Sequence, residues 1–460
     1  MRAKIIVILF LITHYASAQI ASPQIDVYGG AALGAGQDKP FWNVNHQYGK
    51  YSLDPFEAIA GVKIISSDTS ETLIHFDYGL EGYQLVGSNS RSVLHQGYAA
   101  VRTPLVAIRA GMKEETIGSQ DSSLTLGGTV WSHNARPMPK LVIETPGFVD
   151  VPLTKGYLEV NGSLAHGWFE QDRYVKDIFL HQKYLYLRIG GDFMFNASYG
   201  IIHFAQWGGV SPNPRFGNLP ADWDAYKKVF IVQEGDSGTV DNSEVINKLG
   251  NHNGSRQYRV NYNGQALTAS IYYQTIFEDG SGFSKDFYED GIGGVSIKTK
   301  EKDKLINHFL FEYLKTTYQS GPLHDSAGIV LRGNDNYFNH YIYNDGWSHH
   351  GMTIGSPLIT SPLYNKTSRG IKNNRVFALH LGFGGIFNSI PYQTYFTYST
   401  NEGTFDNPFN AKHKQFSWYL EATFPTGFYD VDLNIKLAAD VGEMYGNNLG
   451  LILMLRKSLF

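Results

Sequence analysis

The feature that most constrains this chain is a repeated two-residue alternation of apolar and polar side chains. In TLIHFDYGLEGYQL (72–85), Ile74, Phe76 and Leu80 fall on one face, and mostly polar or small residues fall on the other. Alternation of this length is typical of a strand with one apolar face. After residue 18, no stretch approaches the roughly twenty apolar residues that a membrane helix needs. A chain of this kind can cross a membrane only as strands.

The composition favours a barrel in a membrane over a secreted β-sandwich or β-helix. Aromatic residues make up 14% of the chain and charged residues only 17%, with 30 Tyr and 49 Gly. Soluble domains usually carry about a quarter charged residues. In YDVDLNIKLAAD (429–440) the polar face mixes Asp432 with Lys436, which is typical of a water-filled lumen wall. Few charges and many aromatics are expected where strands face lipid.

The beginning of the chain indicates export. Residues 1–18 have the form of a cleaved signal peptide, with basic residues, an apolar core at 5–12 and the small-residue site Ala16-Ser17-Ala18. The chain has no cysteine, so disulfides and zinc-thiolate sites are excluded. Its formal net charge of −4 argues against nucleic acid as a partner. We expect one domain over 19–460, located in the cell outer membrane.

The predicted fold is all-β, a transmembrane antiparallel β-barrel of about 18 strands. An even number is expected of a bacterial barrel with both termini in the periplasm. The expected strands lie near 24–36, 56–67, 72–86, 92–102, 105–113, 122–130, 156–170, 182–190, 193–206, 255–263, 266–278, 291–300, 304–317, 372–388, 391–401, 413–425, 428–441 and 446–460.

Three long stretches interrupt the strand pattern: 131–155, 207–254 and 318–371. The second contains PADWDAYKKVFIVQE, which predicts a short helix that starts after Pro220. Connections longer than about fifteen residues are uncommon unless they are functional or disordered. We expect these three to be extracellular or folded into the lumen.

The third stretch contains GNDNYFNHYIYNDGWSHHGMTIGSP (333–357), which fits neither a strand nor a helix. Its flat amphipathic rings and amide side chains match the apolar faces and hydroxyls of sugars. The alternative is a loop that packs over the mouth of the barrel, and composition does not separate the two. The candidate glycan-binding residues are Asn334, Asp335, Asn336, Tyr337, Tyr341 and Trp347.

Metal and catalytic signals are weak. His349 and His350 are adjacent and point apart in an extended backbone, so neither a metal site nor a cofactor is predicted. The chain has no G-x-S-x-G, H-E-x-x-H or P-loop motif, so no catalytic residue is predicted. A barrel hydrolase that assembles its residues from neighbouring strands remains an alternative.

Several segments, in the same order, resemble those of one family. They are LHQGYA (94–99), NARPMPKL (134–141), FVDVPLTKGYLEVNGSLAHGWF (148–169), LHQKYLYLRIGG (180–191), YGIIHFAQWGG (199–209), IYYQTIFEDGSG (271–282), FEYLKTTYQSGP (311–322) and GNDNYFNHYIYNDGWSHHGMTIGSPLIT (333–360). The family that they resemble is the capsule-assembly Wzi family, in its Bacteroidetes-type branch. The resemblance implies an eighteen-stranded outer-membrane barrel that associates capsular or extracellular polysaccharide with the cell surface, lectin-like and without turnover. It carries over no residue-level site.

The resulting hypothesis is a non-enzymatic outer-membrane barrel whose long loops bind polysaccharide. Its expected partners are the polysaccharide, outer-membrane lipid and the barrel-assembly machinery, and we expect a monomer. The chain ends on Phe460, the terminal aromatic that such barrels present to that machinery, although Arg456 and Ser458 replace apolar residues of the signal. The main alternative is a porin for a small solute. The two differ in whether the long loops occlude the lumen.

Overall fold

The computed structural model describes residues 22–236, 238, 241, 248–278, 290–321, 324–326, 329–332, 335–365 and 368–459. The predicted signal peptide (1–18) and the predicted site residue Asn334 lie outside the described residues.

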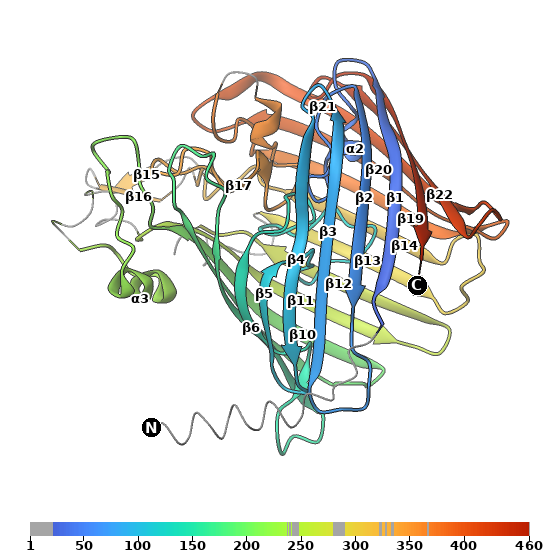
Figure 1. Cartoon of the computed structure of the whole chain (residues 1–460). Helices are drawn as coiled ribbons and strands as arrows, with labels where there is room; N and C mark the ends of the chain where they lie inside the picture. The colour runs from blue at the N-terminus through green and yellow to red at the C-terminus, as the bar shows by residue number, and fades with distance from the viewer. Residues whose placement is uncertain are drawn as a thin grey trace.

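Eighteen antiparallel strands form a closed barrel, which confirms the predicted fold class (Figure 1). The strands follow chain order around the barrel, and β1 closes it by pairing with β23. One of the eighteen is interrupted, because β6 and β7 both pair with β8. The strands are β1 (Gln24–Ala35), β2 (Phe56–Ser66), β3 (His75–Gly87), β4 (Arg91–Arg102), β5 (Ala107–Met112), β6 (Lys140–Glu144), β7 (Val149–Asp150), β8 (Leu158–Trp168), β9 (Phe179–Ile189), β10 (Phe195–Trp207), β11 (Asn251–Asn263), β12 (Leu267–Thr275), β13 (Gly291–Thr299), β14 (His308–Lys315), β19 (Val376–Phe387), β20 (Ile390–Gly403), β21 (Pro408–Pro425), β22 (Val431–Gly442) and β23 (Asn448–Ser458).

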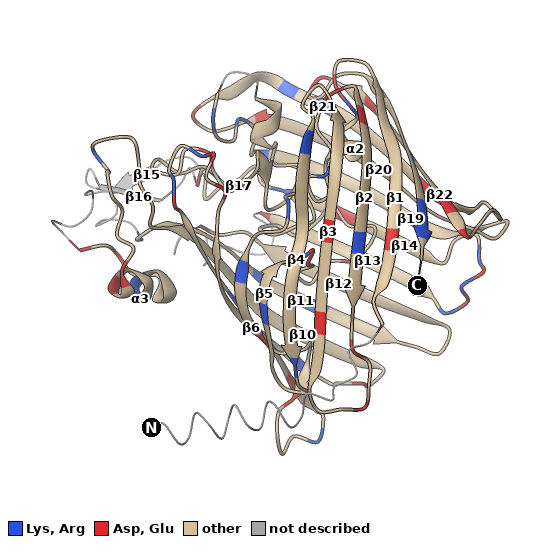
Figure 2. Cartoon of the chain, viewed as in Figure 1, with Lys and Arg blue, Asp and Glu red and all other residues tan. Residues whose placement is uncertain are grey.

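Alternation along each strand separates an apolar outer face from a polar inner face. In β3, Phe76 and Leu80 are 40% and 50% exposed on the outside, whereas Glu81 is 1% exposed inside. In β9, Leu185 and Leu187 face outward and Tyr186 is buried inside. Most strand residues are uncharged (Figure 2). The predicted faces of these strands are confirmed.

The two ends of the barrel differ in their connections. Both ends of the described chain lie at the end with short turns, which we call the short-turn end. The connections 36–55, 113–139, 208–250 and 316–375 all leave the opposite end, the long-loop end. None of the described helices is long and apolar enough to cross a bilayer.

Segments 36–55, 113–139, 335–365 and 368–375 fold into the lumen, and we call them together the plug. The plug contacts inward residues around the wall: Trp131 stacks on Phe204 of β10, with ring centroids 5.1 Å apart. Trp42 meets Tyr395 of β20 edge-on at 5.0 Å. The plug and the wall therefore share one buried core.

The strand predicted at 122–130 is wrong. Leu124 and Leu126 do alternate, but they are buried in the plug rather than placed on the wall. The strand that replaces it in the barrel is β6, continued by β7, within the stretch that was predicted to be a loop. An alternating segment has the same sequence pattern in both settings, since in each its apolar side chains point the same way. The predicted number of strands is nevertheless confirmed.

Short elements occupy the long connections. The helix predicted after Pro220 is α3 (Trp223–Ile231), and it lies outside the barrel (Figure 1). Its N-cap is Asp222, whose carboxylate accepts a hydrogen bond from the N–H of Ala225 at 2.8 Å. The other short elements are α2 (Phe41–Val44), β15 (His324–Ser326), β16 (Ile329–Arg332), β17 (Ser348–His349), β18 (Met352–Thr353) and the 3-10 helix η1 (Pro362–Tyr364).

Candidate functional site

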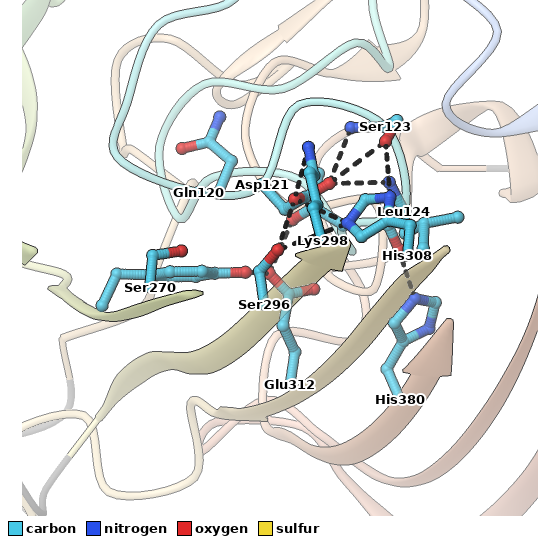
Figure 3. A network of polar contacts seen from close by, with 12 residues as sticks. Gln120, Asp121, Ser123, Leu124, Ser270, Ser296, Lys298, His308, Glu312 and His380 are labelled. Atoms are coloured by element: carbon cyan, nitrogen blue, oxygen red, sulfur yellow. Dashed lines mark hydrogen bonds and ion pairs between the residues drawn. The ribbon is translucent and has the colours of Figure 1, made fainter. Parts of the chain in front are cut away.

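A buried carboxylate ties the second plug segment to strands β13 and β14 (Figure 3). Oδ2 of Asp121 accepts from the hydroxyl of Ser296 at 2.9 Å and lies 3.0 Å from Nε2 of His308. The ammonium of Lys298 lies 3.2 Å from the same oxygen. Burial alone would raise the pKa of Asp121, but the hydrogen bond and charge of His308, with the charge of Lys298, hold it below its usual range. The ionised carboxylate therefore anchors this segment.

A second carboxylate, Glu312 of β14, receives donors from the same segment. It accepts from the N–H of Leu126 at 2.6 Å and from the hydroxyl of Thr125 at 2.7 Å. The hydroxyl of Tyr272 on β12 also donates to it. On β19, Nε2 of His380 lies 2.7 Å from the carbonyl of Leu124. Backbone groups of the plug are thus satisfied by inward side chains of the wall.

The lumen is filled by these contacts at the long-loop end. On β11, Gln257 accepts from the N–H of Ser119 at 2.7 Å. On β22, Asp440 accepts from the N–H of Phe41 at 2.7 Å. On β6, Lys140 forms an ion pair with Glu115 of the plug. Contacts of this kind reach the inward faces of strands from β6 to β22. Such a lumen suits a scaffold better than a solute channel.

Ser123, His308 and Asp121 also have the residue types of a hydrolytic triad. The hydroxyl of Ser123 lies 3.4 Å from Nδ1 of His308, and Asp121 binds the other ring nitrogen. A hydrolase also needs N–H groups that stabilise an oxyanion. The N–H groups of Ser123 and Leu124 instead donate to Oδ1 of Asp121, at 2.9 and 3.1 Å. The geometry fits an anchor for the plug.

Two predicted glycan-binding residues lie in the interior of the plug. Trp347 and Tyr337 are both 0% exposed. The indole N–H of Trp347 donates to the carbonyl of Val130 at 2.9 Å, and the hydroxyl of Tyr337 donates to Asp290 at 2.9 Å. As placed, neither has the exposed ring face that stacking on a sugar requires. Their contacts follow the other interpretation of this segment, a loop that packs over the barrel mouth.

The remaining described candidates lie nearer the surface. Asn336 accepts from the amide of Asn374 at 2.7 Å, and Asp335 accepts from the hydroxyl of Ser320 at 2.6 Å. These two side chains hold the loop in shape. Tyr341 is different, because 41% of it is exposed.

Tyr341 belongs to a cluster on the outside of the long-loop end, which we call the outer cap face. Its ring lies 4.3 Å from that of His340 and 6.1 Å from that of Phe216. The guanidinium of Arg215 lies 5.3 Å from the Phe216 ring. We define the outer cap face as Tyr174, Arg215, Phe216, His340, Tyr341 and Arg369.

The second half of this face is held by an ion pair. Arg369 binds Asp345 at 2.7 Å, and its guanidinium lies 5.7 Å from the ring of Tyr174. Asp345 also accepts from the N–H of Tyr174 at 2.7 Å, which joins loop 169–178 to the plug. Rings beside guanidinium and amide donors can bind the apolar faces and hydroxyls of sugars. Phe216 was missed because it stands alone in a Pro- and Asn-rich turn without any pattern.

The family model described as capsule assembly protein Wzi matches residues 28–360. The chain belongs to the Wzi capsule-assembly family. The predicted family resemblance is thereby confirmed. The function of the chain, as a member of this family, is capsule assembly.

The solved structure of another Wzi protein has the same fold as this Wzi-family chain. Escherichia coli Wzi, described as a carbohydrate-binding outer-membrane β-barrel involved in group 1 capsule assembly, is 15% identical with a TM-score of 0.60, covering 98% of this chain and 87% of that one. OccK5 (OpdH) of Pseudomonas aeruginosa is 9% identical with a TM-score of 0.49, covering 95% of this chain and 97% of that one. The comparison with curated proteins finds no match.

The Wzi-family barrel also has a polar cavity of about 740 Å³ in its lumen, between the plug and the short-turn end. Beside it, Glu81, His95 and Glu114 bring ligand atoms within 4.8 Å of one another, as a metal site would. The ammonium of Lys50, however, lies 3.0 Å from both carboxylates. Lys63 lies 3.6 and 3.3 Å from the same two groups. The lysines supply the positive charge that a metal ion would bring.

Charge balance in this cluster extends to the plug. Glu114 lies just after β5, and its Oε1 is 2.8 Å from Nε2 of His95. Burial would raise the pKa of Glu114, but the hydrogen bond from His95 and the charges of Lys50 and Lys63 lower it well below its usual range. The cluster therefore joins the plug to β2, β3 and β4 by ionic contacts.

Proposed function

We propose that this Wzi-family barrel lies in the cell outer membrane and holds capsular or extracellular polysaccharide at the cell surface through its outer cap face, without enzymatic turnover. The observation that carries the proposal is a filled long-loop end that presents the exposed ring of Tyr341 beside half-buried rings and exposed guanidinium groups. The similar Escherichia coli protein, an outer-membrane carbohydrate-binding barrel, supports it.

The proposal includes how the chain reaches its place. The signal peptide at 1–18 directs export, the barrel-assembly machinery inserts the barrel, and the chain acts as a monomer surrounded by outer-membrane lipid. The apolar outer faces of the strands, such as β3 and β9, support the contact with lipid.

Binding on this face is expected to be weak at each contact. An aromatic stack contributes about 0.5–1.5 kcal/mol beyond area burial. A polymer offers many copies of its repeat unit, so several weak contacts multiply into useful retention. Specificity would come from the donors around the rings, above all Arg215 and Arg369.

The test compares two double variants with the wild type. Phe216→Ala with Tyr341→Ala removes the exposed ring of the outer cap face and the half-buried ring beside it. Phe428→Ala with Tyr429→Ala removes two exposed rings at the short-turn end, where both are about 70% exposed. We expect the first variant to lose most binding to capsular polysaccharide isolated from the source strain, and the second to bind as the wild type does. Equal binding by all three proteins would contradict the proposed site.

A further inference from the structure

An apolar groove of about 820 Å³ lies where α3 meets the outer wall of the barrel, close to the long-loop end. Leu164 of β8 and Trp207 of β10 line it from the wall, and Trp223, Tyr226 and Ile231 line it from the helix. It faces away from the lumen, since these wall positions alternate with the inward residues that contact the plug.

The helix side of the groove is held firmly. Val229 and Ala225 of α3 pack on Ala205 and Trp207 in a buried cluster. Lys183, which points outward from β9, donates to the carbonyl of Phe230, and its ammonium lies 4.2 Å from that ring. A cation at the carboxyl end of a helix is favourable for the helix dipole. The groove is therefore part of the folded structure.

The helix nevertheless leaves large apolar side chains uncovered. Trp223 is 69% exposed and Ile231 is 56% exposed, although both line the groove. The ring of Trp223 stacks on Tyr226 at 5.4 Å. An apolar helix face with Trp and Tyr beside lysines is typical of a segment at a membrane interface.

The wall below the groove continues into the lipid-facing surface. Leu164 pairs with Lys183, and the next outward residues toward the short-turn end are Gly162 and Leu185, which pair with each other. Leu185 is 54% exposed on the outer face. A hydrocarbon chain that enters from this side meets Leu185 and then Leu164, and the ring of His166 is the polar group that the wall adds to the groove lining. A water-borne peptide would have to bury its amide groups against the same wall at a cost.

We propose that the groove under α3 binds one acyl chain of a lipid in the surrounding outer leaflet. The bound chain would cover Trp223 and Ile231 and fix the height of α3 at the membrane interface. Segment 208–236 also carries Arg215 and Phe216, so lipid binding would set the position of the outer cap face above the bilayer. The proposal rests on the barrel spanning a membrane and does not depend on which ligand the outer cap face binds.

The test uses the full chain in nanodiscs of phosphatidylethanolamine and phosphatidylglycerol, with acyl chains plain or brominated. Bromine quenches tryptophan emission on contact, so the difference between wild type and Trp223→Phe gives the quenching of Trp223. Trp418→Phe gives the same difference for a control tryptophan, which sits on the outward face of β21 far from the groove in chain order. We expect brominated chains to quench both tryptophans.

Two groove variants then separate entry into the groove from simple contact with the bilayer. Ala221→Phe fills the groove, and Ile231→Asp places a charge at its edge; Ala221 and Ile231 are both exposed. We expect each variant to reduce the quenching of Trp223 at least twofold and to leave that of Trp418 unchanged. The proposal is overturned if Trp223 is quenched by aqueous acrylamide and not by brominated chains. It is equally overturned if both folded variants keep the wild-type quenching of Trp223.

Discussion

Two connections leave the long-loop end of the barrel and reach opposite sides of its wall. Segment 113–139 enters the lumen, whereas segment 208–236 crosses the rim and places α3 on the outside. Both contain tryptophan, leucine and several charged residues, so their composition does not explain the difference.

The wall that each connection meets does explain it. Inward side chains such as Glu312 and Gln257 accept hydrogen bonds from backbone N–H groups of the first segment. Outward side chains near the rim of β8–β10, such as His181 and Lys183, lie against Tyr226 and Phe230 of the second. The destination of a long loop thus follows the side chains that the strands present to it, which are hydrogen-bond acceptors inside and include the apolar Ala205 and Trp207 outside.

The largest expected effect comes from the centre of the plug. Trp347→Ala should destabilise the protein by about 3–5 kcal/mol, because it leaves a large cavity and an unpaired carbonyl at Val130. We expect a lower melting temperature and the appearance of ion conductance in planar bilayers. Trp418→Ala, on the outer wall, is the matched control and should remain closed. A closed Trp347→Ala variant of wild-type stability would show that the plug does not depend on this core.

A smaller effect is expected at the tie between plug and wall. Glu312→Gln keeps the size of the side chain but replaces one acceptor oxygen by an NH₂ group. In the wild type both carboxylate oxygens accept hydrogen bonds from the plug, so the variant should lose about 1–3 kcal/mol of stability. Hydrogen exchange of peptides from 121–131 should become faster, while those from α3 stay unchanged. Glu159→Gln is the control, because Glu159 pairs with Arg188 within the wall. Equally faster exchange in both variants would show that Glu312 is not a specific anchor of the plug.

Helix α3 in segment 208–236 can be destabilised without a change in the plug. Asp222→Ala removes the N-cap of α3 and should cost the helix about 0.5–2 kcal/mol. Limited trypsin digestion should then cleave sooner at Lys227 and Lys228, with the plug as resistant as before. If segment 113–139 were also cleaved sooner by trypsin in this variant, α3 and the plug would unfold together, against the prediction.

The smallest expected effect is a difference in acid sensitivity. The carboxyls of Asp121, Glu114 and Glu170 hold pKa values below their usual range in the plug and its neighbours. A lowered pKa gives stability that is complete above the ordinary carboxyl pKa of about 4 and is lost as the pH falls below it. Emission from the buried plug tryptophans should therefore stay constant from pH 7 to 5 and shift only below about pH 4. A shift between pH 7 and 5 would contradict this assignment.

The sequence predicted the wall better than the plug, for a physical reason. Alternation in β3 and β9 reports directly which side chains face outward from the barrel, because one face of each strand stays apolar. Leu124 and Leu126 alternate in the same way, yet their burial partners come from distant strands that no local pattern reveals. α3 was predicted because the signal for its start, Pro220, is local.

The proposed outer cap face shares only Tyr341 with the residues predicted from the sequence. A ring that binds a sugar and a ring that packs in a core have the same composition, so Trp347 and Tyr337 could not be placed from the sequence. Tyr341 differs from them only in its exposure, which depends on how loops 208–218 and 335–375 fold together. Family membership supplies capsule assembly as the function and leaves the contact residues to be found.

The most direct test of the central idea, that the loops convert a barrel into a closed scaffold with an outer binding face, is the conductance of the wild-type protein in planar bilayers. We predict no stepwise current from the inserted protein over a range of voltages. Discrete and reproducible conductance steps in the wild type would show an open lumen and contradict the account.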